Sequence, residues 1–176
     1  EKAPHYPRER LRLLHNPNAF GNEDPRRIRE RQVEPATFRI GYLGRISPEK
    51  NPIGLVRAFA RLNQKYPGTR LTLCGPVYFS DYEKEFIEEI TGMAQVEYVG
   101  ATSDPRTFFE SIDGLALSSF IEGRAMTSTE AMSYGLPVLS TDVGGMREVV
   151  LDGQTGILVL LDAFGADPAH ELRPPH

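Results

Sequence analysis

The sequence has only one cysteine, Cys74, among its 176 residues. A single thiol excludes a disulfide within the chain and a thiol-rich metal site, and it fits a reducing compartment. No apolar run approaches the roughly 18 to 20 residues that are needed to cross a bilayer. A secretory signal is lacking too, but the chain begins with Glu1, so we expect it to be a piece of a longer protein. Together these features favour a cytoplasmic domain.

An excess of positive charge is also lacking, since 20 Lys and Arg residues against 24 Asp and Glu residues give a formal net charge of −4. This balance argues against nucleic acid as the main partner. The basic residues are nevertheless unevenly placed, with a cluster near the start at Arg8, Arg10, Arg12, Arg26, Arg27, Arg29 and Arg31. A solvated surface accounts for this cluster, while contact with an anionic membrane at its cytoplasmic face, or with a partner domain, stays open.

The composition changes twice along the chain. Residues 1–36 are rich in Pro and Arg, and their prolines interrupt every candidate element except an apolar patch at 11–14 that could form a strand. We interpret this part as a linker or hinge. Residues 162–176 are rich in Ala, Asp and Pro and are expected to be a truncated or disordered tail. Residues 37–161 are expected to form one folded domain.

Within that domain, short apolar runs alternate with segments of helical periodicity. Asn51-Pro52 and Asp104-Pro105 are typical helix starts, a capping side chain followed by Pro at the first helical position. The expected strands are 38–43, 71–74, 96–99, 115–117, 138–140 and 157–160; the expected helices are one from 52 to the stop at Pro67-Gly68, then 80–91, 105–112, 127–134 and a short one ending at 148–151. The alternation predicts an α/β fold, a Rossmann-like doubly wound parallel sheet of about six strands, with ligands at the carboxyl ends of the strands.

The loop after the first strand contains Gly44-Arg45 and Lys50. Glycine lets a ligand approach the backbone, and the two cations suit phosphate oxygens. A solvated helix start accounts for the same residues, so this loop alone is a weak indication. No G-x-G-x-x-G follows the strand, and no Walker A sequence occurs in the chain.

The stretch 118–132 is more informative, because it leaves the fourth strand and enters a helix. Gly123 and Ala125 leave the first helical N–H groups accessible, which makes a diphosphate site. Glu122 and Glu130 are too far apart to form a simple same-face pair, but two separated carboxylates can accept hydroxyls from different parts of one elongated ligand. The alternative is that Glu122 is a surface loop residue and Glu130 a solvated helix residue.

These residues resemble a known family, the retaining glycosyltransferases of the GT-B fold and in particular the large group-one family. The glutamate pair with seven residues between its members carries the resemblance. It continues through Gly135-Leu136-Pro137-Val138, Gly144-Gly145 and Thr155-Gly156, and the upstream Gly44-Arg45 and Lys50-Asn51 match the family's other signature. The similarity covers about residues 38–160 and implies that this chain is one half of a GT-B fold.

The resemblance implies a role for each matching position. Arg45 and Lys50 would hold the diphosphate, Glu122 would contact hydroxyls of the donor sugar, and Glu130 would accept from the ribose. The loops at Gly75 and Gly100-Ala101 would lie against the nucleobase. The implied donor-binding set is Gly44, Arg45, Lys50, Gly75, Gly100, Ala101, Glu122, Gly123, Arg124, Ala125, Met126 and Glu130, with Glu122, Arg45 and Lys50 as its catalytic members.

The implied activity is transfer of a sugar from a UDP-, GDP- or ADP-linked donor to an acceptor, with retention, in carbohydrate biosynthesis. The family usually needs no metal, and we expect no metal and no cofactor here. The N-terminal acceptor domain of the family is not found in this sequence, so the piece alone is expected to be inactive. A non-catalytic nucleotide-sugar-binding module, and a GT-B epimerase or phosphorylase, stay open as alternatives.

Some residues depart from the family pattern or invite other interpretations. Arg124 and Ala125 stand where the family often has an aromatic or apolar residue followed by Gly, which puts a neutral donor sugar in doubt. Ser140 and Asp142 suggest hydrolase chemistry, but no G-x-S-x-G elbow occurs. Cys74 is expected to be a small buried hydrophobe. His5, His15 and His170 lie in Pro-rich or terminal segments and are not expected to bind metal.

Overall fold

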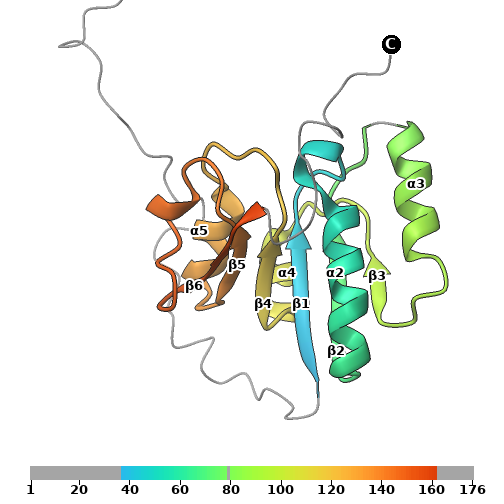
Figure 1. Cartoon of the computed structure of the whole chain (residues 1–176), viewed down its shortest axis with the longest axis horizontal. Helices are drawn as coiled ribbons and strands as arrows, with labels where there is room; N and C mark the ends of the chain where they lie inside the picture. Colours follow the sequence, from blue (N-terminus) through green and yellow to red (C-terminus); the bar gives the residue numbers. More distant parts are fainter. Residues whose placement is uncertain (1–36, 79, 162–176) are drawn as a thin grey trace, which may run out of the picture.

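The computed structural model describes residues 37–78 and 80–161, which form one parallel sheet with helices on both faces (Figure 1). The strands are β1 Phe38–Leu43, β2 Thr69–Cys74, β3 Val96–Tyr98, β4 Gly114–Leu117, β5 Val138–Thr141 and β6 Gly156–Val159. The helices are α2 Pro52–Lys65, α3 Ser80–Ile90, α4 Pro105–Ser111 and α5 Met126–Ser133, with the 3-10 turns η2 Pro48–Lys50 and η3 Met146–Glu148. The expected hinge at 1–36, its candidate strand at 11–14 and the tail at 162–176 lie outside the described residues.

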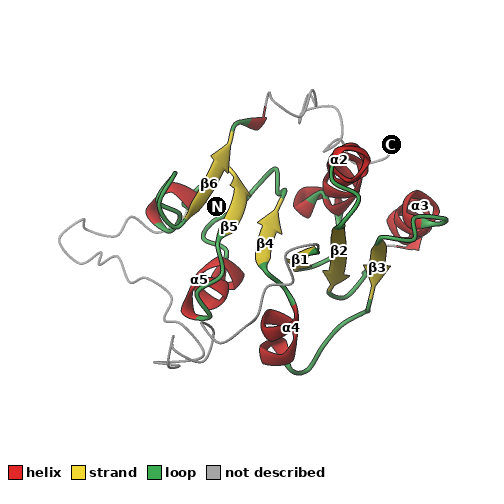
Figure 2. Ribbon diagram, turned by 90° about the horizontal axis from the view of Figure 1, so that it is seen from below, coloured by secondary structure: helices red, strands yellow, loops and turns green. Residues whose placement is uncertain are grey.

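The six strands lie in the order β3-β2-β1-β4-β5-β6, all parallel. Figure 2 shows α2 and α3 on one face of the sheet and α4 and α5 on the other. The chain changes face where it leaves the edge strand β3, because α4 carries it back across the sheet to β4, beside β1. The strand order reverses between β1 and β4, so the helices that follow these two strands, α2 and α5, lie on opposite faces of the sheet (Figure 2). Folds of this kind bind ligands at the carboxyl ends of the strands at such a point. The predicted doubly wound sheet is thereby confirmed.

Each face of the sheet has its own hydrophobic core, because successive side chains of a strand point to opposite faces. The α2–α3 face buries Tyr42, Leu71 and Leu73 of the sheet against Val56 and Phe59 of α2 and Phe86 of α3. On the α4–α5 face, Leu115, Leu117 and Val138 of the sheet are buried. They belong to one core with Phe109 of α4, Ile112 at the end of α4 and Ala131 of α5. Strands that are covered on both sides explain why the sequence shows continuous apolar runs instead of alternation.

The start of α2 is fixed both locally and across the sheet. Asn51 caps the helix, as predicted, with its side chain accepting a hydrogen bond from Gly54 N at 3.0 Å. Asn51 itself has a left-handed backbone with φ of 50°, and the turn η2 precedes it. Ser118, after β4, donates its hydroxyl to the Asn51 carbonyl at 2.7 Å. The helix start is therefore attached to the end of β4, which brings the loop after β1 next to the loop after β4.

The boundaries differ slightly from the predicted ones. The short helix expected to end at 148–151 is the 3-10 turn η3, and α5 begins at Met126, one residue before the predicted start. The last strand is Gly156–Val159, shifted by one residue. The bounds of the last strand depend on its pairing with β5, which a single sequence does not show. Within the described ranges, no helix combines the length and the hydropathy needed to span a membrane.

Candidate functional site

A cavity of about 230 Å³ lies at the carboxyl ends of β1 and β4. It is formed by the loop after β1, the loop after β4 and the first turn of α5. Its lining residues are Tyr42, Leu43, Gly44, Lys50, Leu117, Ser119, Glu122, Arg124, Ala125, Met126 and Thr127. Six predicted site residues therefore meet in one place, although they come from two stretches far apart in the sequence: Gly44, Lys50, Glu122, Arg124, Ala125 and Met126.

Lys50 and Glu122 form an ion pair in this cavity, with Lys50 Nζ 2.7 Å from Glu122 Oε1. Ser119 donates its hydroxyl to the same oxygen at 2.9 Å. The side chains of Lys50 and Glu122 are only 20% and 9% exposed. Glu122 is therefore not a solvated loop residue, and the pair joins the loop after β1 to the loop after β4. The sequence does not indicate Ser119 as a site residue, because a serine just after a strand gives no sign of a partner three residues later.

Arg45 lies beside this cavity but is not part of its lining. Its guanidinium forms an ion pair with Glu49 at 3.1 Å, and its side chain is half exposed. The Arg45 carbonyl accepts a hydrogen bond from the Tyr42 hydroxyl at 2.6 Å. Burial raises the pKa of Tyr42 well above its usual value, and the nearby Tyr82 and Glu122 raise it further. Tyr42 therefore stays a neutral hydrogen-bond donor that holds the loop in place.

The Gly144-Gly145 loop packs directly against the turn that carries Glu122. Gly145 N donates to the Gly123 carbonyl at 2.7 Å. A Cβ atom on Gly144 would overlap the Glu122 carbonyl, and one on Gly145 would overlap the Gly123 carbonyl. This close backbone approach explains the paired glycines and fixes the position of the Glu122 turn.

Arg124 is the unusual side chain of the cavity. Its Nε and Nη1 atoms are buried and have no hydrogen-bond partner among the described residues. The neighbouring Ala125 is the N-cap of α5 and supplies no side-chain cap. The uncapped start of α5 and the Arg124 side chain thus lie on the same side of the cavity, an arrangement that suits an anion.

Glu130 lies in the second turn of α5 and is not among the residues that line this cavity. Its side chain is partly buried, and this burial raises the pKa of its carboxyl group. Glu130 is therefore a partly buried helix residue, and its predicted contact with a ribose stays a prediction.

The predicted nucleobase contacts lie at the neighbouring edge, where β2 and β3 end. Gly75 N donates to the Gly100 carbonyl at 2.9 Å, and Gly44 N donates to the Cys74 carbonyl at 3.0 Å. Gly75 has a φ of 151°, and a Cβ atom there would overlap the Gly44 carbonyl. The glycine allows the loops after β1 and β2 to touch, so the three loops form one continuous edge.

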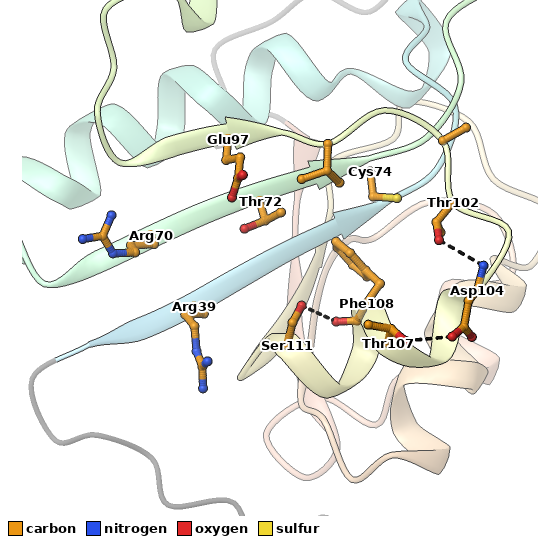
Figure 3. A pocket seen from close by; sticks show the side chains of 12 residues that line it. Arg39, Arg70, Thr72, Cys74, Glu97, Thr102, Asp104, Thr107, Phe108 and Ser111 are labelled. Atoms are coloured by element: carbon orange, nitrogen blue, oxygen red, sulfur yellow. Dashed lines mark hydrogen bonds between the residues drawn. The ribbon is translucent and has the colours of Figure 1, made fainter.

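A larger cavity of about 470 Å³ runs along the face of β1, β2 and β3 beside α4 (Figure 3). It includes Ala101 but no other predicted site residue. The hydroxyls of Thr107 and Ser111 donate to Asp104 and to the Phe108 carbonyl, so they serve the helix itself. Ligands of such folds bind at the carboxyl ends of the strands, which favours the smaller cavity as the functional site.

The described part of the chain offers little support for a metal site, a reactive thiol or a hydrolase site. No group of three or more His, Cys, Asp or Glu residues there could hold a metal ion. Cys74 is fully buried, as expected, and burial raises the pKa of its thiol. Asp142 accepts a hydrogen bond from Arg147 Nε at 2.6 Å, which lowers the pKa of Asp142, whereas the Ser140 hydroxyl donates to the Thr141 carbonyl. Ser140 and Asp142 therefore form no catalytic pair, and the three discounted histidines, His5, His15 and His170, lie outside the described residues.

The architecture and the cavity define a Rossmann-like α/β domain with a cavity lined by Lys50, Glu122 and Arg124 at its strand ends. Comparison with known proteins makes the assignment specific. The family model of glycosyl transferases group 1 matches residues 24–160. The chain belongs to this family.

Individual relatives agree with that assignment. The D-inositol 3-phosphate glycosyltransferase of Pseudarthrobacter chlorophenolicus is 34% identical over 160 residues, which cover 80% of this chain and 37% of that protein. The structure of Anabaena Alr3699/HepE in complex with UDP and glucose has a TM-score of 0.65 at 26% identity, covering 77% of this chain and 40% of that one. The lipopolysaccharide outer core galactosyltransferase WaaB, in its apo form, has a TM-score of 0.63 at 28% identity and the same 40% coverage. The chain thus spans well under half the length of these relatives.

Proposed function

We propose that this chain is the donor-binding domain of a retaining glycosyltransferase and that its cavity receives the sugar and diphosphate part of a nucleotide sugar. One observation carries the proposal: Lys50, Glu122, Arg124 and the uncapped start of α5 meet in a single cavity at the ends of β1 and β4. The Anabaena HepE structures contain UDP and, in one of them, UDP-glucose, which supports a ligand of this class.

The diphosphate would bind between the loop after β1 and the start of α5. Lys50 supplies a point charge inside the cavity, and Arg45 supplies a planar guanidinium at its rim. Both cations have carboxylate partners here, Glu122 and Glu49, so the arriving phosphates would take over part of these contacts. The positive groups would then stabilise the charge that develops on the departing nucleoside diphosphate, without a metal ion.

The two glutamates would hold different parts of the donor. Glu122 points into the cavity and would accept hydroxyls of the sugar, while Glu130, farther along α5, would accept from the ribose. The nucleobase would lie against the edge formed by Gly75, Gly100 and Ala101. A further domain of the parent protein would bind the acceptor, and we place the reaction in the cytoplasm.

The test compares nucleoside and nucleoside diphosphate binding to the Lys50→Ala variant by titration calorimetry. We use uridine with UDP, guanosine with GDP and adenosine with ADP. Lys50→Ala is expected to weaken the diphosphate by about 1.5–3 kcal/mol, the value of a charge-assisted contact, and to leave the nucleoside nearly unchanged. Lys84→Ala, which removes an exposed lysine on α3, is the matched control and should change neither. Equal losses for nucleoside and diphosphate would rule out the phosphate role.

A further inference from the structure

Three charged side chains line the cavity, Lys50, Glu122 and Arg124, and they do not balance. The ion pair between Lys50 and Glu122 neutralises two of them. Arg124 remains as an excess positive charge, with Nε and Nη1 buried and without a hydrogen-bond partner in the described part of the chain. Buried N–H groups of a cation that lack an acceptor cost free energy, so this site favours a ligand that brings an anionic acceptor.

The size of the cavity limits which part of a ligand reaches Arg124. At about 230 Å³ it is smaller than the roughly 300–1,000 Å³ of sites that enclose whole drug-sized ligands. It is too small to enclose a whole nucleotide sugar, so the nucleoside part must extend beyond it. Arg124 therefore lies near the sugar and diphosphate end of the donor, away from the nucleoside.

We propose that Arg124 binds the carboxylate of an acidic donor sugar, so that the donor is a nucleoside diphosphate hexuronic acid. This inference rests on the proposed function. Arg124 is two residues from Glu122 on the same turn, which places it beside the sugar, while Lys50 and Arg45 are already assigned to the diphosphate. A neutral sugar offers only hydroxyl acceptors and leaves the positive charge of Arg124 without an anionic acceptor. A carboxylate neutralises that charge and forms the strong, charge-assisted hydrogen bonds for which guanidinium is suited.

The experiment measures binding by calorimetry to the 176-residue chain. The probes are UDP, UDP-glucose and UDP-glucuronate, together with GDP, GDP-mannose and GDP-mannuronate. For the base that binds, the uronate donor is expected to bind at least about tenfold more tightly than its neutral counterpart. R124Q should abolish this preference and leave the bare diphosphate within about twofold of the unaltered chain, whereas R124K should retain part of the preference. R61Q, on the exposed side of α2, is the matched control and should retain all of it.

The outcomes distinguish a failure of the uronate proposal from a failure of the proposed function. Equal binding of neutral and acidic donors overturns the uronate proposal but leaves the proposed function standing. An equal loss of bare diphosphate and uronate donor in R124Q also overturns it, because the anion at Arg124 is then a phosphate. Failure of UDP, GDP and ADP alike to bind overturns the proposed function itself. A thermal melt of each variant shows that the fold is intact, so a lost preference reflects the site.

Discussion

At the residue scale, the two glutamates of the motif have different surroundings. Glu122 accepts from Lys50 and Ser119 and is almost fully enclosed in the cavity. The side chain of Glu130, on α5, is partly buried, and this burial raises the pKa of its carboxyl group. Residue types and spacing alone treat the pair as equivalent, so only the structure shows that Glu122 is preorganised by partners from two loops.

This difference predicts that glutamine substitutions at the two positions separate sugar binding from nucleotide binding. Glu122→Gln should spare the bare nucleotide and weaken the nucleotide sugar, because an amide offers one acceptor and adds a donor where a hydroxyl needs an acceptor. Glu130→Gln should weaken both ligands alike. The expected penalty is roughly 1–3 kcal/mol for each lost contact, measured by calorimetry. Should Glu122→Gln weaken the bare nucleotide as much as Glu130→Gln does, the two roles are misassigned.

The raised pKa of Glu130 also predicts a pH-dependent effect on stability. The folded state disfavours the ionised carboxyl of Glu130, so protonation of this group stabilises the fold. This stabilisation is complete below the unfolded pKa of about 4.3, and it is lost as the pH rises through the folded pKa. Glu130→Gln should therefore raise the free energy of unfolding at pH 7, and this gain should shrink as the pH falls toward 4. Urea denaturation at both pH values measures it, with Glu110→Gln on the exposed side of α4 as the control. A gain that is independent of pH would contradict the argument.

At the scale of elements, the position of the Glu122 turn depends on the loop that follows β5. We predict that Gly145→Ala destabilises the fold by about 1–3 kcal/mol, because the added Cβ atom would overlap the Gly123 carbonyl and force the two loops apart. Gly123→Ala is the matched substitution on the other side of the contact, and its Cβ atom would meet nothing within 4 Å. It should cost far less. Thermal melts of the two variants make the comparison, and equal losses would show that the close approach is not what requires glycine at 145.

The elements themselves could largely be predicted from the sequence, because their signals are local. Asn51 and Asp104 both cap their helices as expected, with Asp104 accepting from Arg106 N at 3.2 Å. The turn η2 was not predicted, because its geometry depends on contacts with the loop after β4, such as that between Phe120 N and the Glu49 carbonyl at 2.9 Å.

The site could be predicted only in part for the same reason. The motifs identified Lys50, Glu122 and Arg124 as candidate residues, and the structure brings all three into one cavity. The ion pair that joins Lys50 to Glu122, and the burial of Arg124 without a partner, result from loops that meet only after the sheet has formed. Such contacts between distant residues leave no periodic or local pattern in a single sequence.

At the scale of the whole molecule, the candidate site and the hydrophobic cores lie in different parts of the sheet. The strand order reverses between β1 and β4, which places the candidate site at that point, while both faces of the sheet are occupied by hydrophobic cores. The chain spans 37% of the Pseudarthrobacter relative and 40% of Anabaena HepE. The candidate site lies at one edge of this domain, so the rest of a glycosyltransferase would have to face it from outside. This part alone is therefore expected to bind a donor without completing the reaction.

We therefore predict that the 176-residue chain melts cooperatively and binds a nucleoside diphosphate but transfers no sugar. Two complete cores support independent folding, and ligand binding to the native state should raise the melting temperature with ligand concentration. Transfer also needs an acceptor surface and the exclusion of water from the reacting bond, neither of which an open cavity of about 230 Å³ supplies. Melting curves with increasing UDP, GDP or ADP test binding, and an assay with nucleotide sugar and added glucose or glycolipid acceptors tests transfer. Repeated turnover by this chain alone would contradict the prediction that transfer needs a further domain. A melting temperature that no nucleotide changes would contradict the predicted nucleotide binding.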